Sequence, residues 1–403
     1  MPRLLIVTPY FPPEMGAPQA RLFELGSRLI EHGWQVEALT ALPSYPTGRI
    51  FPGYCKARPI RQTLGAIQVL RVPVYPANRG FLRRLASYLS FTASAALLGG
   101  RCARPDVILC ESPPLFTGLA GLWLARHFAC PWLLNISDLW PRSAIEMGVL
   151  AEDSLSARWA GALERALYRR ADAVSGQSQE IVTDIHQRVP GTRARVITNG
   201  VEPARFGPQH VDREARDLIG PEPGPVFLYA GLLGLAQGLD RVLDVVFALP
   251  ASVPGRLVLV GDGPLRASLA ARIDAAGSGR VRLLPAQPRA RVPALLATAD
   301  VALVSLGQTL RGAVPSKIYE AMASGVAILL VADGEAASRV TRAPSGLRVA
   351  PGDPAALAAA WERLATEPAL RARLGAAGRE EAENRYSRAA TAAQLDALLR
   401  TLL

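Results

Sequence analysis

Between two short apolar runs the chain reads Val314-Pro315-Ser316-Lys317-Ile318-Tyr319-Glu320-Ala321-Met322-Ala323-Ser324-Gly325. Pro315 suits the first turn of a helix and Gly325 suits its end, so this stretch is predicted to form one short helix. The first turn of a helix offers unpaired backbone N–H groups and a partial positive charge, which favour a bound phosphate. Lys317 adds a full charge, and Glu320 lies on the same face one turn later. A carboxylate there can accept hydrogen bonds from vicinal ribose hydroxyls, so the stretch is typical of a nucleotide diphosphate site.

The same spacing also occurs in a capped surface helix in which Lys317 and Glu320 form an ordinary ion pair. Composition favours the phosphate site. The chain has 45 Lys and Arg residues, of which only Lys56 and Lys317 are lysines. In a chain so rich in arginine, a lysine at a helix start indicates a need for a compact charge.

The apolar runs beside this helix belong to a pattern that extends over the whole chain. Strand-like runs alternate with helical patterns, which predicts parallel sheets covered by helices on both faces. The predicted strands of the first half are Arg3–Thr8, Trp34–Thr40, Ala66–Val72, Val107–Cys110, Trp132–Ile136, Ala173–Ser175 and Arg195–Thr198. Those of the second half are Val226–Tyr229, Arg256–Val260, Val281–Leu284, Val301–Val304 and Ala327–Val331.

At 403 residues the chain exceeds the usual size of one compact core, so two domains are expected. A turn-rich linker at residues 199–208 separates the two sets of strands. We therefore predict a first domain of residues 1–204 and a second of residues 205–387, with a tail helix in residues 388–403 that could rejoin the first. Two doubly wound domains in series normally hold their ligand in the cleft between them, at the carboxyl ends of their strands.

The net charge of +11 is unevenly distributed. No acidic residue occurs between Glu37 and Asp106, a window with ten Lys or Arg residues: Arg49, Lys56, Arg58, Arg61, Arg71, Arg79, Arg83, Arg84, Arg101 and Arg104. A field of one sign attracts anions, such as acidic lipid head groups, a lipid diphosphate or nucleic acid. Nucleic acid is the least favoured of these, because the window has no zinc motif and no aromatic signature of an RNA-binding module.

Residues Phe81–Leu98 within this window form a predicted basic amphipathic helix. Apolar side chains fall on one stripe, formed by Leu82, Leu85, Leu89, Ala93 and Ala96, and Arg83 falls on another. Such a helix can lie at a membrane interface and attract anionic lipid, which makes Arg83, Arg84, Leu85 and Tyr88 candidates for a membrane or acceptor surface. An ordinary helix packed on the core, with solvated arginines, is the alternative.

Neither a signal peptide nor a membrane span is expected. The apolar run Leu4–Val7 is too short for a signal-peptide core and is predicted to be a strand, and no run reaches the roughly 18 residues that cross a bilayer. The four cysteines, Cys55, Cys102, Cys110 and Cys130, and the four scattered histidines lack metal-ligand spacing. We therefore expect a cytoplasmic, soluble or peripheral protein with reduced thiols and no metal site.

Several motifs occur in the order found in glycosyltransferase family 4, and the chain resembles that family along nearly its whole length. They are Thr8-Pro9-Tyr10-Phe11-Pro12-Pro13-Glu14 with Gly16, Glu111-Ser112-Pro113-Pro114, Ser137-Asp138-Leu139-Trp140-Pro141, Asn199-Gly200-Val201-Glu202, Gly231 to Gly238, Gly261-Asp262-Gly263-Pro264 and Ala299-Asp300-Val301. Residues 315–320 are similar to the branch that includes L-fucosamine transferases of bacterial surface polysaccharides. The resemblance implies an α/β protein of the GT-B fold, with two Rossmann-like doubly wound domains facing a central cleft.

The resemblance also implies roles for the predicted donor site. Glu320 would hold the ribose and Lys317 the diphosphate, with help from the backbone at Ser316 and Ile318. Gly16 follows the first strand, where a missing side chain either lets backbone approach a phosphate or sugar or simply allows a turn. Gly263 either lines the nucleotide pocket or serves a turn.

The chain departs from the family in two places near this site. Relatives carry a second glutamate eight residues before Glu320, where this chain has Gly312. The polar candidates near that position are Gln308, Thr309 and Arg311. Relatives also place Arg and Lys in the loop at residues 231–238, where this chain has apolar residues and Gln237. The phosphate charge must then be met by Lys317, by helix dipoles and by Arg311.

A third departure concerns the first domain, where many relatives have a histidine at Glu111-Ser112 or at Ser137. Asp138 follows a predicted strand and is the first candidate for an acceptor-positioning or proton-accepting residue, with Glu111 second. Alternatively, Asp138 caps the turn that begins at Leu139. The resemblance implies a metal-independent reaction that retains the anomeric configuration, in which Lys317 stabilises the leaving diphosphate and the donor phosphate draws the acceptor proton.

The predicted function is transfer of a hexose or an N-acetylated (deoxy)hexosamine from a nucleotide diphosphate sugar, UDP being the expected nucleotide. The expected acceptor is a lipid-diphosphate-linked saccharide of bacterial surface polysaccharide synthesis, such as an undecaprenyl-linked sugar, at the inner face of the plasma membrane. A nucleotide-sugar epimerase and a non-catalytic GT-B partner protein are the alternatives.

Overall fold

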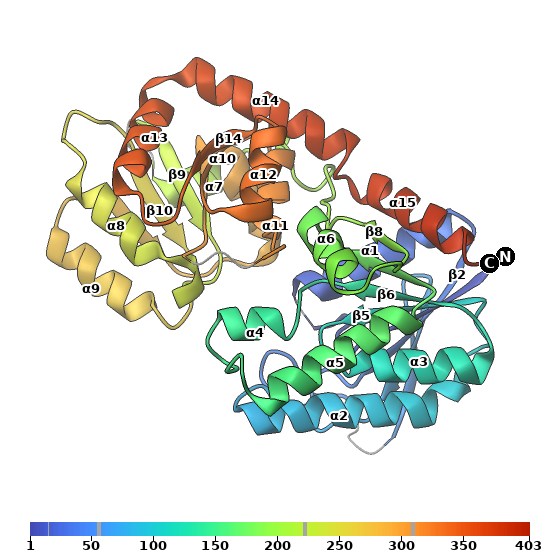
Figure 1. Cartoon of the computed structure of the whole chain (residues 1–403). Helices are drawn as coiled ribbons and strands as arrows, with labels where there is room; N and C mark the ends of the chain where they lie inside the picture. The colour runs from blue at the N-terminus through green and yellow to red at the C-terminus, as the bar shows by residue number, and fades with distance from the viewer. Residues whose placement is uncertain (15, 55–57, 221–223, 308–310) are drawn as a thin grey trace. The chain divides into compact units, whose positions relative to one another are not determined.

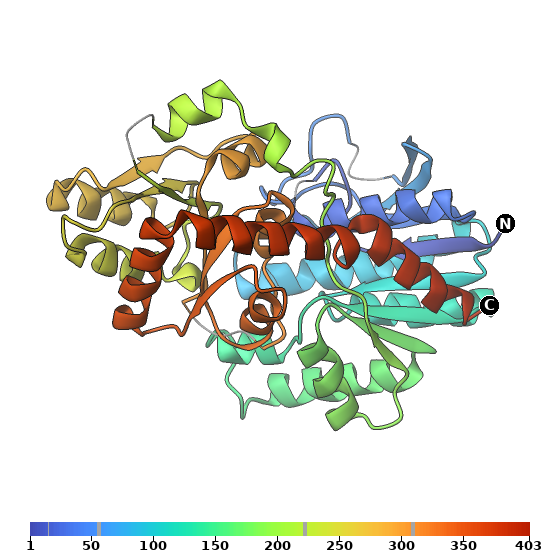
Figure 2. The same cartoon turned by 90° about the horizontal axis from the view of Figure 1, so that it is seen from above.

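The computed structural model of the protein describes residues 1–14, 16–54, 58–220, 224–307 and 311–403. The chain divides into two compact units (Figures 1 and 2). The first comprises Met1–Asn199 with Arg388–Leu403, and the second comprises Gly200–Ser387. The boundary expected from the sequence, residue 205, lies a few residues inside the second unit.

The first unit is built on an eight-stranded sheet of order β3-β4-β2-β1-β5-β6-β7-β8. Its strands are β1 (Arg3–Val7), β2 (Gln35–Ala41), β3 (Ile60–Leu64), β4 (Ile67–Val72), β5 (Val107–Ser112), β6 (Trp132–Ile136), β7 (Ala173–Gly176) and β8 (Ala194–Val196). Neighbouring strands are parallel, except for the edge pair β3 and β4, which is antiparallel. Such a sheet must be covered on both faces, because its strands are apolar on both sides.

The helices of the first unit supply these covers. They are α1 (Ala17–Glu31), α2 (Phe81–Leu98), the 3₁₀ turn η1 (Gly99–Arg101), α3 (Thr117–Phe128), α4 (Arg142–Glu146), α5 (Leu155–Arg170), α6 (Gln179–Arg188) and α15 (Arg388–Arg400). Helices α2, α3, α5 and α6 contribute to the core on one face, and α1 and α15 to the core on the other. The tail helix α15 lies beside α1 in both views (Figures 1 and 2), where Arg388 Nε donates to Glu24 at 2.7 Å.

The second unit is built on a fully parallel six-stranded sheet of order β11-β10-β9-β12-β13-β14. Its strands are β9 (Val226–Ala230), β10 (Arg256–Val260), β11 (Val281–Leu284), β12 (Val301–Ser305), β13 (Ala327–Val331) and β14 (Gly346–Val349). Its helices are α7 (Arg213–Ile219), α8 (Leu239–Ala248), α9 (Arg266–Ala276), α10 (Val292–Thr298), α11 (Ser316–Ala323), α12 (Gly334–Arg342), α13 (Pro354–Thr366) and α14 (Pro368–Asn384), with 3₁₀ turns η2 (Pro208–His210), η3 (Leu235–Gln237) and η4 (Arg289–Arg291). Helices again cover both faces of the sheet.

The twelve strands predicted from the sequence all form, with ends shifted by at most two residues. Strands β3 and β14 were not predicted. Strand β3 reads Ile-Arg-Gln-Thr-Leu, and its mostly polar edge position gives no apolar run. It joins β4 through Gly65, whose φ of +59° suits a tight turn between antiparallel strands.

Two further expectations concern the membrane and the cysteines. Over the described residues, no helix is both long enough and apolar enough to span a bilayer. Cys102 and Cys110 are buried free thiols and Cys130 is a half-buried one, whereas Cys55 lies outside the described residues.

Candidate functional site

Helix α11 begins one residue later than the sequence suggested. Pro315 is its N-cap, Ser324 is its C-cap, and Gly325 follows in the left-handed conformation (φ +69°). Among the described residues no side chain caps the first turn, and the first N–H groups of a helix have no partner within the helix itself. Ile318 is fully buried and its backbone N–H already donates to the carbonyl of Pro315 at 3.1 Å, so neither its side chain nor this N–H is open to a ligand.

Lys317 of α11 points at the end of strand β9. Its Nζ lies 3.9 Å from the centroid of the Tyr229 ring, in a cation–π contact. A Cβ atom at residue 231 would lie 2.5 Å from the same Nζ, so Gly231 leaves the space that the ammonium occupies. Burial lowers the pKa of Lys317 to about 8, although the Glu320 carboxylate acts in the opposite direction. Among the residues that the structure describes, no ion pair with the Lys317 ammonium is found, so this buried charge is a ready partner for a phosphate.

Glu320 lies one turn further along α11. Burial raises the pKa of its carboxyl group. The charges of Arg289 and Lys317, a hydrogen bond from the Ser316 side chain and the charge of Arg205 oppose that rise. The carboxylate is therefore surrounded by cations but keeps acceptor capacity for ligand hydroxyls.

The loops that follow β9 and β10 interlock through glycines. A Cβ at Gly261 would lie 1.9 Å from the carbonyl oxygen of Gly231, and a Cβ at Gly263 would lie 2.4 Å from that of Leu233. The Leu233 N–H donates to the carbonyl of Asp262 at 2.9 Å. Gly263 has φ +155°, a conformation that favours glycine. Gly263 thus permits close backbone contact with Leu233, and Gly261 permits it with Gly231.

Gln237 stabilises the loop at residues 231–238 through two hydrogen bonds. Its side-chain oxygen accepts from the backbone N–H of Gly234 at 3.1 Å, and its carbonyl accepts from Ser305 Oγ at 2.6 Å. Gln237 therefore shapes the loop in which relatives carry cations. The position of the missing glutamate, Gly312, has φ +75°, so a glutamate would be strained there. Arg311 is exposed, and Gln308 and Thr309 lie outside the described residues.

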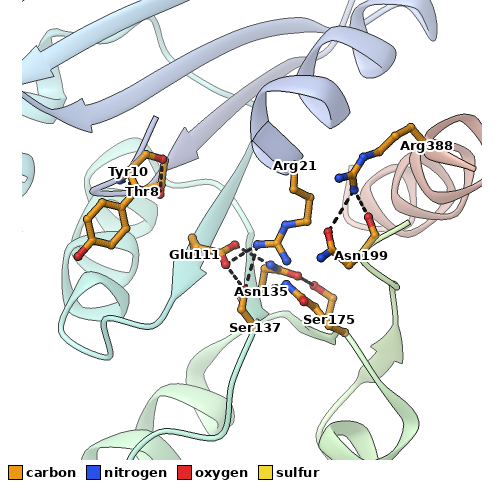
Figure 3. Close-up of polar contacts among 10 residues, drawn as sticks. Thr8, Tyr10, Arg21, Glu111, Asn135, Ser137, Ser175, Asn199 and Arg388 are labelled. Carbon is orange, nitrogen blue, oxygen red and sulfur yellow. Dashed lines mark hydrogen bonds and ion pairs between the residues drawn. The ribbon is translucent and has the colours of Figure 1, made fainter. Parts of the chain in front are cut away.

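In the first unit, Arg21 and Glu111 form a buried ion pair near the carboxyl end of strand β5 (Figure 3). Arg21 comes from α1 and is 3% exposed, and Glu111 comes from β5 and is 1% exposed. Arg21 Nη2 donates to Glu111 Oε1 at 2.5 Å and to Ser137 Oγ at 3.0 Å. The other carboxylate oxygen accepts from Asn135 Nδ2 at 2.6 Å.

This network extends sideways to neighbouring strands. Ser175 Oγ of β7 donates to Asn135 Oδ1 at 2.7 Å, and the amide of Gln177 is hydrogen-bonded to Ser137 Oγ at 2.8 Å (Figure 3 shows Ser175 and Asn135). The Glu111 carboxylate, predicted as a second catalytic candidate, is thus occupied by protein donors on both oxygens. Its geometry suits a residue that positions its neighbours.

Gly16 is the N-cap of α1 and is extended, with φ 172°, which any residue can adopt. Within the described residues, this helix start has no side-chain cap. A Cβ at Gly16 would lie 2.3 Å from Gln19 Oε1, which is buried and finds no partner among the described residues. Gly16 is therefore needed for the space that Gln19 occupies at the helix start, and not for a left-handed turn.

Asp138 follows β6 and is half-buried. Its Oδ2 accepts from Ser143 Oγ of α4 at 2.7 Å. Burial raises the pKa of Asp138, while hydrogen bonds from Ser143 and from the backbone of Leu139 lower it and the charge of Glu146 raises it. Asp138 therefore accepts hydrogen bonds from the first turn of α4 and from the backbone of Leu139, which agrees with the alternative interpretation.

On helix α2, the predicted apolar stripe does not face the core. Leu82 is 75% exposed and Leu89 44% exposed, whereas Phe91 and Ala95 are buried. The helix packs on the core through Phe91 and Ala95 instead, and its arginines are solvated, which agrees with the alternative of a core-packed helix. Arg83 and Arg84 are exposed, while Leu85 and Tyr88 are half-buried. The guanidinium of Arg84 donates to Tyr88 Oη at 2.8 Å, and the pKa of Tyr10 is raised by burial and by the neighbouring Tyr88.

Sequence reasoning missed Arg21 and Tyr229. Arg21 gives no signal, because it lies among helix residues and its partner is 90 positions away. Tyr229 ends a predicted strand just before Gly231, a position that could have drawn attention to it. Over the described residues, no group of three or more His, Cys, Asp or Glu side chains could hold a metal ion. Metal independence itself stays a prediction.

Two family models match this chain, and the residues they match correspond closely to the two units. Residues 16–200 match the model of the glycosyl transferase 4-like domain, and residues 211–381 match that of glycosyl transferases group 1. The glycosyl transferase WcaI of Escherichia coli, named for colanic acid biosynthesis, is 28% identical over 82% of this chain and 83% of its own. The Pseudomonas aeruginosa protein WbjE, named as a glycosyltransferase, is 29% identical over 72% of this chain and 74% of its own.

The solved structures add a likeness of fold. The Anabaena protein Alr3699/HepE, solved in complex with UDP-glucose, has a TM-score of 0.72 at 17% identity, covering 99% of this chain and 100% of that one. Together with two wound parallel sheets, this confirms the GT-B fold and its two Rossmann-like domains.

Proposed function

Because the chain belongs to the family 4 glycosyltransferases of GT-B fold, we propose that it transfers a hexose or N-acetylated (deoxy)hexosamine from a nucleotide diphosphate sugar, with UDP as the nucleotide. The acceptor is a lipid-diphosphate-linked saccharide of bacterial surface polysaccharide synthesis. The observation that carries the proposal is the Lys317 ammonium held over Tyr229 and Gly231, with Glu320 one turn away.

The donor site follows from these groups. Lys317 and the open N–H groups of α11 bind the diphosphate, and Glu320 accepts hydrogen bonds from the two ribose hydroxyls. The choice of UDP is supported by the UDP-glucose complex of a protein with this fold. Since the loop at Gly231 lacks the cations of relatives, Lys317 supplies most of the full positive charge at the phosphates.

The reaction is a same-face displacement. The bond from the anomeric carbon to the diphosphate oxygen breaks, and the acceptor hydroxyl oxygen forms the new bond on the same face. The acceptor proton passes to the departing diphosphate, whose charge Lys317 stabilises. Asp138 accepts a hydrogen bond from the acceptor and positions it. No step calls for a metal ion.

The acceptor class and location are proposed from the first unit. Helix α2 exposes Phe81, Leu82, Leu89 and Leu97 beside Arg83, as an interfacial helix does. The relative named for colanic acid biosynthesis agrees with a polysaccharide product. The protein would then work at the inner face of the plasma membrane, bound to it peripherally.

A transfer assay tests the proposal. The purified chain is incubated with UDP-sugars and a short-chain lipid-diphosphate sugar, with and without EDTA. A longer glycan with retained anomeric configuration is expected. Glu320→Gln should remove nearly all transfer, whereas Glu362→Gln, an exposed residue of α13, should not. Intact transfer in Glu320→Gln would point to another site, and a new sugar from the donor alone, detected by NMR, would show an epimerase.

A further inference from the structure

A basic cavity of about 640 Å³ opens beside the start of α2 in the first unit. The loops after β2 and β4 and the helix start form its walls, and Arg49, Arg79 and Arg83 line it. None of its lining residues is acidic. Within the described part of the chain, none of the three guanidinium groups makes an ion pair with a carboxylate. Three uncompensated arginines around one hollow fit a phosphate or diphosphate, which arginine binds in bidentate geometry.

An apolar cavity of about 220 Å³ lies next to it. Its apolar walls are Phe81, Leu85, Phe116, Trp140, Val149 and Leu150. Arg84, held by Tyr88, is the cation in its lining. Phe81 is 53% exposed and Val149 62% exposed, so the apolar surface continues from the cavity to the outside.

The two cavities share Asn78. They are therefore neighbours, with the basic cavity on one side of Asn78 and the apolar cavity on the other. A ligand that fits both sides carries a compact anionic group joined to a hydrocarbon chain. We propose that this pair of cavities, the α2 site, binds a lipid diphosphate, with its head among Arg49, Arg79 and Arg83 and its chain in the apolar cavity.

The size of the apolar cavity limits what it encloses. Sites that enclose a drug-sized ligand measure roughly 300–1,000 Å³. A cavity of about 220 Å³ holds only the part of the chain nearest the phosphate. The remainder passes the exposed rim at Phe81 and Val149, where it can rejoin a bilayer.

The α2 site also adjoins the predicted acceptor residue. Trp140 in its wall lies two residues after Asp138, and Ala144 in its wall follows Ser143, whose hydroxyl donates to Asp138 Oδ2. Asp138 therefore lies beside the apolar cavity, the half of the α2 site that would hold the lipid chain. The inference rests on the proposed function, because it assigns the place where the lipid part of that acceptor binds.

Farnesyl diphosphate is a water-soluble probe for this site, since it joins a diphosphate to a short hydrocarbon chain. Its binding to the full chain is measured by isothermal titration calorimetry without membranes, beside farnesol and inorganic diphosphate. We expect farnesyl diphosphate to bind at least about tenfold more tightly than either fragment. Equal binding of inorganic diphosphate, or of farnesol, would overturn the amphipathic site.

Variants separate the two halves of the α2 site. Two variants should each weaken farnesyl diphosphate binding about tenfold or more. The triple variant Arg49→Ala, Arg79→Ala, Arg83→Ala removes the charges of the basic cavity. The rim variant Val149→Glu places a charge in the apolar cavity. The matched control, Arg101→Ala, Arg126→Ala, Arg158→Ala, removes the same charge from exposed positions of the first unit and should bind as the parent does. Equal weakening in the control would reduce the effect to net charge and overturn the proposal.

The two hypotheses fail in different ways. If sugar is transferred and UDP binds while farnesyl diphosphate does not bind, the α2 site is wrong and the transferase stands. If farnesyl diphosphate binds with the expected variant pattern but no sugar is transferred from any UDP-sugar, the lipid site stands and the proposed transfer is contradicted.

Discussion

The Nζ of Lys317 lies 3.9 Å above the ring of Tyr229 and fills the space that a side chain at Gly231 would need. The ammonium thus rests on the negative face of an aromatic ring rather than in water. Tyr229 is itself fixed, because its hydroxyl donates to the carbonyl of Leu232 at 2.6 Å. The ring of Tyr229 and the space at Gly231 therefore hold the Lys317 ammonium at the end of β9.

Binding of UDP should weaken as the pH rises through about 8, the value to which burial lowers the pKa of Lys317. The anionic ligand prefers the protonated lysine, so binding above that pH must take up a proton. Calorimetry with UDP in buffers of different ionisation enthalpy, between about pH 7.5 and 9.5, measures this uptake. The range lies above the second phosphate pKa of about 6. Lys317→Arg stays charged and should lose the step; a step of the same size in that variant would assign it elsewhere.

The ring of Tyr229 should matter more to donor binding than its hydroxyl. Tyr229→Leu removes the cation–π contact, worth about 0.5–2 kcal/mol, and should raise the Kd for UDP roughly 2- to 30-fold. Tyr229→Phe keeps the ring and should bind UDP nearly as the parent does, with some loss of thermal stability from the missing hydrogen bond to Leu232. Equal Kd values for the two variants would show that the ring does not hold the lysine.

Gly231→Ala should displace the Lys317 ammonium, because the new Cβ would lie 2.5 Å from Nζ. Gly279 provides the matched control: it also has positive φ, +63°, but nothing lies within 4 Å of its added Cβ. Both variants carry backbone strain of about 1–3 kcal/mol, seen as lower unfolding midpoints. Only Gly231→Ala should raise the KM for the donor. A similar KM increase in Gly279→Ala would assign the effect to strain.

The sequence pattern predicts the sheets well because buried parallel strands are continuous apolar runs, as in Arg256–Val260 of β10. It also predicts the donor helix, because Lys317 and Glu320 are close in the chain. It cannot predict Arg21 with Glu111 or Tyr229 with Lys317, since those pairs form only when distant segments meet. Nor does periodicity tell which stripe of α2 faces solvent, because Leu82 and Phe91 are both apolar.

Breaking the Arg21–Glu111 pair should destabilise the first domain strongly. Glu111→Gln leaves the Arg21 charge buried without its carboxylate, which costs about 3–5 kcal/mol. The control Glu31→Gln breaks an exposed pair with Arg28 and should cost less than about 1 kcal/mol. Urea denaturation compares the two. The double variant Arg21→Met, Glu111→Leu should recover stability, and its failure to do so would show that the hydrogen bonds to Ser137 and Asn135 matter more than the charge pair.

Asp138 should act on the acceptor in its ionised form. Burial raises its pKa above the ordinary value, so kcat/KM should fall as the pH drops through that raised value. Asp138→Asn should remove this acid limb and raise the acceptor KM about tenfold or more, while the donor KM stays unchanged. A large loss of kcat at unchanged acceptor KM would instead make Asp138 the proton acceptor.

Ser143→Ala separates this role from mere folding. The Ser143 hydroxyl donates to Asp138 Oδ2 at 2.7 Å and lowers its pKa. Without that hydrogen bond the ionised carboxylate is less favoured, so the acid limb of kcat/KM should move to higher pH while the plateau at higher pH is retained. A general loss of folded protein would lower the plateau without moving the limb. An unmoved limb in Ser143→Ala that also persists in Asp138→Asn would assign the titration to another group.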